Sequence, residues 1–211
     1  MRSRSVVGTA TATAAATAAL LTAATATAAA APAAPAAPRS TAPGFLTADD
    51  LPPHSTSPWY EGPVAKGLPD PETFCVDGAI PDKGGTYHRL FRTDYDTNAS
   101  QVGVAAKSAK AAGKLAAKLE KRVANCAADW LRDNPGSTAS WDDYGTVEAG
   151  DGAHIYGVHT APAESEHGVS LFAVVRKGAK VTVVRWAEMG TLADAPAAAF
   201  RMTTTKAAAR L

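Results

Sequence analysis

The chain has 211 residues, with 21 Lys and Arg against 20 Asp and Glu and a formal net charge of +1 at pH 7. This length predicts one domain with an additional terminal segment, because single cores of about 100–200 residues are the common size. The near-neutral charge excludes a dedicated nucleic-acid-binding protein, since such domains are strongly basic over their surface.

The first 44 residues differ in composition from the rest of the chain. Residues 9–38 consist of 18 Ala, 7 Thr, 3 Pro and 2 Leu. Two arginines precede an uncharged run with small-x-small sites, which predicts a secretory signal peptide over residues 1–30 and an Ala/Pro-rich linker over residues 31–44. The alternative, a membrane anchor, would need about 20 predominantly apolar positions, which this run lacks. The sequence therefore predicts a secreted, extracellular domain over residues 45–211 and no stable membrane span after signal cleavage.

Cys75 and Cys126 are the only two cysteines. In an oxidising compartment such a pair most simply forms one disulfide. The bond would close a loop of roughly 50 residues and stabilise the fold by about 4 kcal/mol through chain entropy. Free thiols and a metal site remain the alternatives, although zinc would need further Cys or His ligands at short spacing, and neither cysteine has one.

The domain begins with a proline-rich segment, in which regular structure is limited to short pieces. Residues 47–52 predict a single capped helical turn that is stopped by proline. Trp59 and Tyr60 are expected to cover the core. Residues 86–93 and 101–106 are rich in β-favouring side chains and predict the first two strands.

Residues 107–132 carry the clearest pattern in the chain. Apolar residues at helical spacing fall on one face: Ala112, Leu115, Leu119, Val123, Cys126 and Trp130. Lysines occupy the opposite side, so the segment predicts a long amphipathic helix that ends at the sequence Asn134-Pro135-Gly136. The lysine stripe is interpreted as a solvated helix face, with a contact for an anionic polymer or lipid headgroups as the alternative.

Beyond Gly136 the pattern becomes extended. Four further strands are predicted over residues 140–147, 153–160, 169–176 and 181–188. The last two form a hairpin and are apolar on both faces, which places them in the middle of a sheet that is covered on each side. A terminal helix is then predicted to begin at Pro196. The predicted fold is α+β, an antiparallel sheet of five or six strands packed with the long amphipathic helix and a C-terminal helix.

The chain contains no catalytic motif at diagnostic spacing. It has no Gly-x-Ser-x-Gly elbow, His-Glu-x-x-His pair, phosphate loop or helix-loop-helix calcium site. His154 and His159 lie five positions apart on one predicted strand, so they point to opposite faces and cannot ligate one metal together. Residues 164–167 combine two carboxylates, a hydroxyl and an imidazole, and are interpreted as a polar hairpin loop. The sequence favours a non-catalytic protein and predicts neither a metal site nor a cofactor.

Four residues are candidates for ligand binding. Arg185 and Glu188 are charged residues on an otherwise apolar strand, where buried charges must be paired or functional. They would either form an internal ion pair or open into a cleft and hold a ligand. Trp141 and Tyr144 flank two adjacent acids, as aromatic residues do in sugar-binding clefts, with a solvated edge strand as the alternative.

The leading hypothesis is a secreted, monomeric, non-catalytic binding or sensor-like domain whose ligand is an extracellular molecule or a cell-envelope component. A secreted cell-wall glycan hydrolase is the first alternative, and it would use acids among Asp142, Asp143, Glu166 and Glu188. It requires two carboxyls that face one cleft, about 5–10 Å apart. A secreted protease inhibitor is the second, but the cysteine pair encloses a predicted strand and helix rather than an exposed loop.

The order of these features resembles a known family. A Pro-rich start with Cys75 is followed by a strand and by a long Ala-rich helix with Cys126 and Trp130. Strands closing on Val183-Val184-Arg185-Trp186 and a terminal helix complete a pattern that looks like the extracellular sensor domains of actinobacterial proteins similar to the PknH receptor kinase. The resemblance covers about residues 45–211 and implies an α+β fold with a cleft that binds an extracellular ligand. This sequence departs from the receptor in having no kinase domain and two cysteines in place of four, and no ligand-binding residue is carried over.

Overall fold

The computed structural model describes residues 42–82 and 84–211. The signal peptide predicted for residues 1–30 and most of the linker predicted for residues 31–44 lie outside this range. From the N-terminus, the described residues form η1 (Ala48–Asp50), β1 (Tyr60–Glu61), β2 (Ala65–Lys66), β3 (Thr86–Arg92), β4 (Asn98–Ala105), α1 (Ala109–Asp133), β5 (Thr138–Val147), β6 (Gly152–Ala161), β7 (Gly168–Lys177), β8 (Lys180–Met189) and α2 (Ala197–Arg210).

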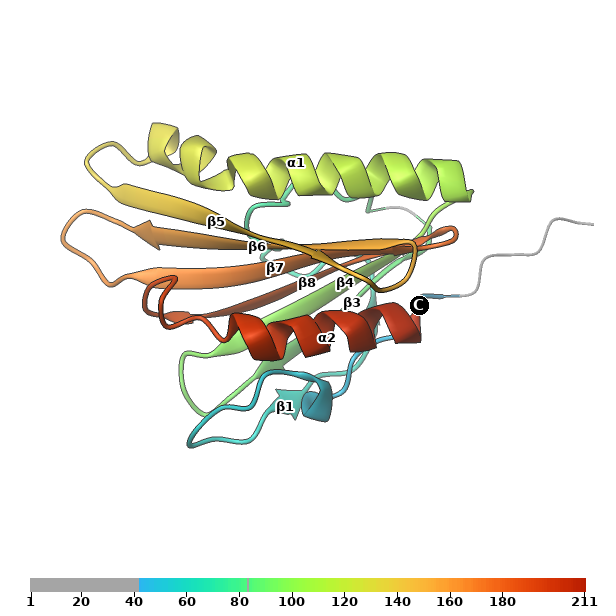
Figure 1. Cartoon of the computed structure of the whole chain (residues 1–211), viewed down its shortest axis with the longest axis horizontal. Helices are drawn as coiled ribbons and strands as arrows, with labels where there is room; N and C mark the ends of the chain where they lie inside the picture. The colour runs from blue at the N-terminus through green and yellow to red at the C-terminus, as the bar shows by residue number, and fades with distance from the viewer. Residues whose placement is uncertain (1–41, 83) are drawn as a thin grey trace, which may run out of the picture. The chain divides into compact units, whose positions relative to one another are not determined.

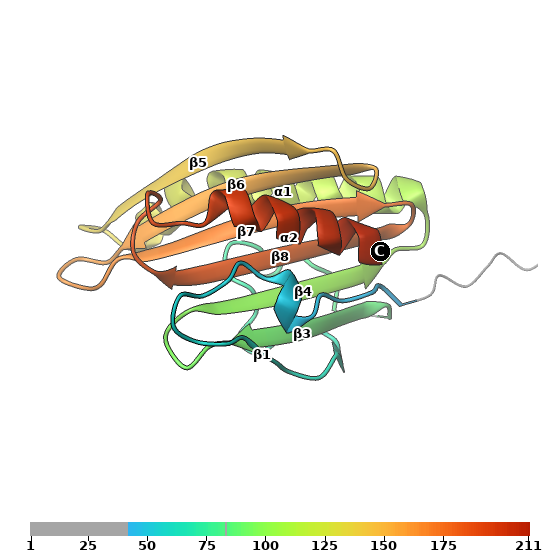
Figure 2. The same cartoon turned by 60° about the horizontal axis from the view of Figure 1, so that its bottom comes forward.

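All the strands belong to one antiparallel sheet. Their order is β1-β3-β4-β8-β7-β6-β5, and β2 adds to β3. Helix α1 covers one face of the sheet and α2 lies on the other (Figures 1 and 2). The predicted α+β fold is therefore confirmed, and the six predicted strands all form. The two-residue strands β1 and β2, which arise in the proline-rich segment, were not predicted.

The core has two layers because the side chains of the central strands alternate between the faces of the sheet. We call these the α1 face and the α2 face, after the helix packed on each. On β7, Phe172 and Val174 pack on the α1 face, whereas Leu171 and Val175 pack on the α2 face. Helix α1 packs its predicted apolar stripe into the layer on the α1 face, where Ala112, Leu119 and Val123 are fully buried.

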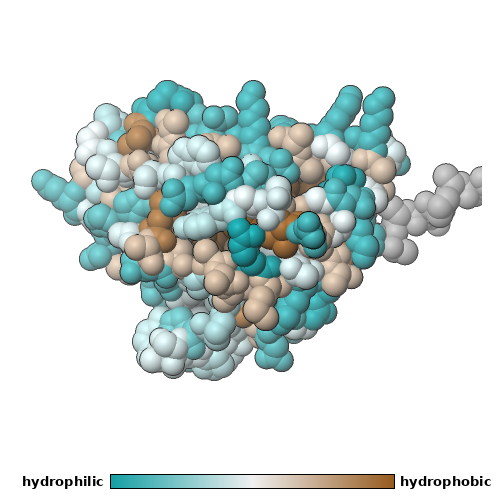
Figure 3. Space-filling view, in the orientation of Figure 1, coloured by the Kyte–Doolittle hydropathy of each residue, from teal (hydrophilic) through white to brown (hydrophobic). Residues whose placement is uncertain are grey.

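The predicted disulfide is present and attaches a loop to α1. Cys75 and Cys126 are bonded, with their Cα atoms 5.3 Å apart. Lys118 donates to the carbonyl oxygen of Ala79 at 2.9 Å, and Arg122 donates to that of Asp77 at 3.2 Å. The loop over residues 67–82 is therefore held against the helix. The other α1 lysines face solvent, where Figure 3 shows hydrophilic side chains over the helix.

The segment around η1, with Leu46 and Leu51, packs on the α2 face. The predicted capped turn is confirmed as η1, whose Asp50 accepts hydrogen bonds from the backbone N–H and the hydroxyl of Thr47. Gln101 of β4 is fully buried and accepts a hydrogen bond from the Leu46 N–H at 2.7 Å. Within the described ranges, no helix combines the length and the apolarity needed to cross a membrane.

Candidate functional site

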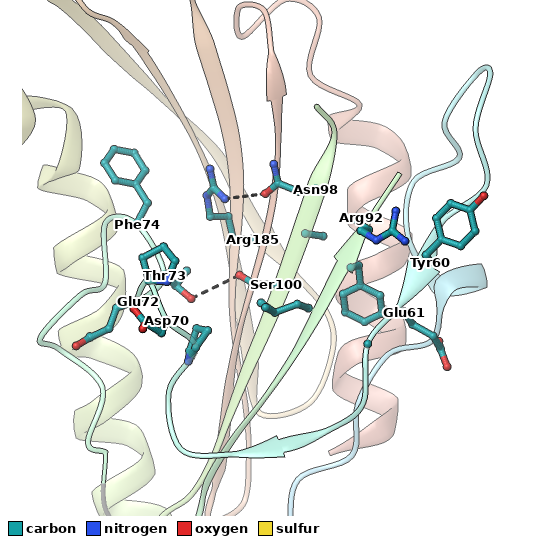
Figure 4. A pocket seen from close by; sticks show the side chains of 16 residues that line it. Tyr60, Glu61, Asp70, Glu72, Thr73, Phe74, Arg92, Asn98, Ser100 and Arg185 are labelled. Carbon is teal, nitrogen blue, oxygen red and sulfur yellow. Dashed lines mark hydrogen bonds between the residues drawn. The ribbon is translucent and has the colours of Figure 1, made fainter. Parts of the chain in front are cut away.

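A cavity of about 620 Å³ opens on the α1 face of β3, β4 and β8 (Figure 4). Its volume lies in the range of small-molecule sites, which is about 300–1,000 Å³. Helix α1 packs mainly over β5, β6, β7 and β8, so β3 and β4 depend on the loop over residues 67–82 for cover on this face. The cavity remains between that loop and β1. Its lining is Tyr60, Glu61, Gly62, Pro69, Asp70, Pro71, Glu72, Thr73, Phe74, Leu90, Phe91, Arg92, Asn98, Ala99, Ser100 and Arg185.

Strand register brings the polar residues of this lining together. Ser100 on β4 lies opposite Leu90 on β3 and opposite Arg185 on β8. Asn98, two positions earlier on β4, lies opposite Arg92. Residues that are opposite one another or two apart share a face, so all five point to the α1 face.

Among the residues that the structure describes, Arg185 has one side-chain partner and no counter-charge. Its Nη1 donates to Oδ1 of Asn98 at 3.1 Å. Its Nε is buried without a hydrogen-bond partner among the residues that the structure describes. No ion pair within this part of the chain includes Arg185. Burial lowers the pKa of Arg185 to about 10, so the guanidinium remains charged at neutral pH.

The lining contains three carboxylates. Asp70 is exposed, and the other two have partners. Glu61 pairs with Arg89 at 2.8 Å, and Glu72 accepts a hydrogen bond from the Gly78 N–H at 2.8 Å. Figure 4 shows both side chains turned away from Arg185. The hydroxyls of Thr73 and Ser100, 3.5 Å apart, lie in the region between the loop and β4. The polar groups of the lining that lie next to Arg185 on its side of the cavity include the Asn98 amide and the hydroxyls of Thr73 and Ser100.

A second cavity of about 380 Å³ adjoins the first. The two share Phe74, Asn98 and Arg185 in their linings, and Trp130 and Met189 contribute to the second. Arg185 therefore lies at the border of the two cavities. Phe74 lines both cavities as well, and the disulfide at the next residue, Cys75, fixes the loop that carries its ring.

Of the two alternatives for Arg185 and Glu188, the internal ion pair does not form among the described residues. Arg185 lies opposite Phe172 on the α1 face, whereas Glu188 lies opposite Val169 on the α2 face. Residues an odd number of positions apart on a strand point to opposite faces. Glu188 accepts a hydrogen bond from the Thr97 hydroxyl at 3.3 Å, and burial raises the pKa of its carboxyl. It reaches the second cavity near the end of β8 but does not line the first.

Trp141 and Tyr144 lie on β5, at the opposite edge of the sheet from β1 and β3. The ring of Trp141 is 6.3 Å from that of Tyr156, between centroids, and 45% of the residue is exposed. The Tyr144 hydroxyl donates to the Leu192 carbonyl at 3.5 Å, and the ring packs in the α2-face core. The structure therefore brings these two aromatic residues neither to each other nor to Arg185.

The four acids considered for glycan hydrolysis are distributed over the sheet. Asp142 lies opposite Gly157, and Asp143 binds His154 at 2.6 Å, an interaction that lowers the pKa of Asp143. Glu166 is in the loop between β6 and β7, and Glu188 is at the end of β8. Of the four, Glu188 alone lines either of the two cavities.

Sequence reasoning missed Phe74, Asn98 and Ser100. Asn98 and Ser100 alternate with core residues on a short strand, which is a signal for one polar face. Their proximity to Arg185 depends on the pairing of β4 with β8, and this pairing joins residues 75 to 89 positions apart. Tyr60, which was expected to cover the core, is 41% exposed and lines the cavity instead.

No family model, curated protein or solved structure matches this chain. The likeness to PknH-like sensor domains therefore rests on the sequence features given above.

Proposed function

We propose that this chain is an extracellular, monomeric, non-catalytic binding protein for a small organic anion with an apolar body. The observation that carries the proposal is the half-buried side chain of Arg185, whose Nε is fully buried and whose guanidinium borders the larger cavity without a carboxylate partner in the described residues. Buried charges in proteins are generally paired, because transfer from water into a medium of low dielectric is costly.

An anionic ligand would supply the missing counter-charge. Carboxylate, phosphate and sulfate groups accept two hydrogen bonds from a guanidinium, and within the described residues only Nη1 of the three Arg185 nitrogens has a hydrogen-bond partner. The hydroxyls of Ser100 and Thr73 lie in the same lining and can donate to further oxygens.

The remaining lining suits an apolar body. Pro69, Pro71, Phe74 and Leu90 contribute apolar surface, and the Tyr60 ring lies under the guanidinium of Arg92 at 4.8 Å from its centroid. Rings and aliphatic side chains gain free energy when a hydrocarbon group displaces water from them. A ligand with its charged group at Arg185 would extend its apolar part toward β1.

Location outside the cell is supported by three observations. The cysteine pair forms a disulfide, which is typical of oxidising compartments. The leader composition predicts export, and the likeness to PknH-like sensor domains implies an extracellular binding role. These features support the proposal, and a direct test of export is mass analysis of the product in the culture medium.

The binding test is a calorimetric titration of the chain with acetate, hexanoate and decanoate, and with decanol as the uncharged control. We expect Kd to fall by up to about fourfold for each methylene that enters the cavity, because each buried CH₂ contributes about 0.8 kcal/mol. Decanol should bind at least tenfold more weakly than decanoate. Equal binding of decanol and decanoate, or no binding of either, would contradict the proposal.

A further inference from the structure

His159 and His167 lie side by side where β6 leads into β7. Nε2 of His159 and Nδ1 of His167 are 2.9 Å apart, and the two ring centroids are 5.0 Å apart. His159 is half-buried in the strand and His167 is exposed, so an ion can reach the pair from solvent.

The backbone on both sides of the pair is fixed by hydrogen bonding. His159 lies opposite Val169 in the ladder between β6 and β7. His167 immediately precedes β7, and its carbonyl oxygen accepts a hydrogen bond from the Gly190 N–H at 2.9 Å. Side chains carried by strands are held more precisely than side chains on free loops. The short distance between the two nitrogens therefore follows from the hairpin register.

Neutral imidazole is the form of histidine that binds metals. With both rings neutral, one proton lies between the facing nitrogens as an N–H···N hydrogen bond.

We propose that His159 and His167 bind one divalent transition-metal ion through these facing nitrogens, with Cu²⁺ preferred. Each ring then carries its single proton on its outer nitrogen, so coordination changes the tautomer of one ring and no electron is transferred. The described residues provide no group of three or more His, Cys, Asp or Glu side chains that could hold a metal, so water completes the coordination.

The 2.9 Å between the nitrogens is the length of their hydrogen bond, and it brings both nitrogens within reach of one metal ion. The preference for Cu²⁺ follows from the general affinity order for nitrogen ligands, in which Cu²⁺ stands above Ni²⁺ and Zn²⁺.

The loop that joins the two histidines carries net negative charge. Residues 162–167 include Glu164 and Glu166, both exposed, and no Lys or Arg. These carboxylates raise the local concentration of cations. The site lies apart from the lining of the larger cavity, so it does not depend on the function proposed for Arg185.

The test uses the full chain without an affinity tag, titrated with Cu²⁺ in the presence of glycine as a competing chelator. Electron paramagnetic resonance of the one-equivalent complex should show two coordinated imidazole nitrogens. We expect His159→Gln and His167→Gln each to weaken Cu²⁺ binding at least tenfold. His154→Gln, which removes an imidazole bound to Asp143 elsewhere in the fold, is the control and should leave the affinity unchanged.

Competition separates this site from a general cation site. Ni²⁺ and Zn²⁺ should displace Cu²⁺ only at higher concentrations, and Mg²⁺ should not displace it. Thermal melting verifies that each variant folds, and the exposed His167→Gln variant decides the question alone if His159→Gln does not fold. Unchanged Cu²⁺ affinity in His167→Gln, or a spectrum with a single imidazole nitrogen, would overturn the assignment.

Discussion

The guanidinium of Arg185 donates to the side-chain oxygen of Asn98 at 3.1 Å, across the junction between β8 and β4. This neutral amide orients the arginine without cancelling its charge. The contact therefore leaves a positioned cation at the border of two cavities, with its Nε buried and unsatisfied among the described residues. A positioned donor group of this kind is typical of a site that binds an anion.

Removal of this charge should stabilise the ligand-free protein. Arg185→Met keeps the long apolar stem but removes the desolvated guanidinium, so we expect the free energy of unfolding to rise by about 1 kcal/mol. Urea unfolding measures the change. Arg132→Met is the control, since the Arg132 side chain is 69% exposed, and its effect should stay within about 0.5 kcal/mol. A loss of stability in Arg185→Met would assign Arg185 a structural role.

The Phe74 ring should contribute to affinity for the apolar part of a ligand. Phe74 lines both cavities, and its truncation removes apolar contact area from the binding site. We expect Phe74→Ala to weaken decanoate binding about tenfold, which corresponds to about 1.4 kcal/mol. Trp141→Ala removes another partly exposed aromatic ring, on β5, and should have no effect. Equal weakening by the two variants would argue against this cavity as the site.

The disulfide should stabilise both the fold and the cavity wall. Cys75 and Cys126 are 51 positions apart, and closure of a loop of this length stabilises a protein by about 4 kcal/mol through chain entropy. Urea unfolding with and without a reducing agent measures this contribution. Because Cys75 adjoins Phe74, reduction should also weaken decanoate binding. Coincident unfolding curves under the two conditions would contradict the prediction.

Asp50 should give a stability contribution that is lost in acid. Burial raises the pKa of Asp50, but hydrogen bonds from Thr47 and the positive charge of Arg210 outweigh it, and the pKa in the folded protein is lowered. A carboxyl with a lowered folded pKa stabilises the protein above its unfolded pKa of about 3.9 and loses this contribution as pH falls through the folded value.

Asp50→Asn tests this contribution. Its side chain is 9% exposed and contacts Lys206 and Arg210 of α2, so we expect a loss of about 2 kcal/mol at pH 7. The difference from the unmodified chain should shrink below about pH 4, where the carboxyl begins to protonate in the unfolded chain, and continue to shrink toward the lower pKa of the folded protein. Urea unfolding of both proteins at several pH values between about 3 and 7 provides the comparison. A difference that is constant over that range would contradict the assignment.

Much of the fold could be predicted from periodicity. The 3.6-residue pattern over residues 107–132 became α1, Ala109–Asp133, and placed Cys126 on the buried side. Apolar alternation located β7 and β8 in the interior of the sheet, because strands covered on both faces have apolar residues at successive positions. These features are local, and each is read from one continuous segment.

The site could be predicted only in part, because it is formed by segments that are distant in the sequence. Arg185 was identified as a charge on an apolar strand, but Asn98 reaches it through the pairing of β4 with β8, for which no local pattern exists. The separation of Arg185 from Glu188 could have been predicted, since an odd spacing on a strand places side chains on opposite faces. The pair His159 and His167 also follows from hairpin register once the ends of β6 and β7 are fixed.

The most direct test of the account is the affinity for decanoate of the unmodified chain and of Arg185→Met, compared by titration calorimetry under the same conditions. If the guanidinium binds the carboxylate, the variant should bind about thirtyfold more weakly, equivalent to about 2 kcal/mol for a charge-assisted hydrogen bond. Decanol, which lacks the charge, should bind the two proteins equally. Equal affinity of the two proteins for decanoate would show that Arg185 does not hold the anion, and the proposed function would then be wrong.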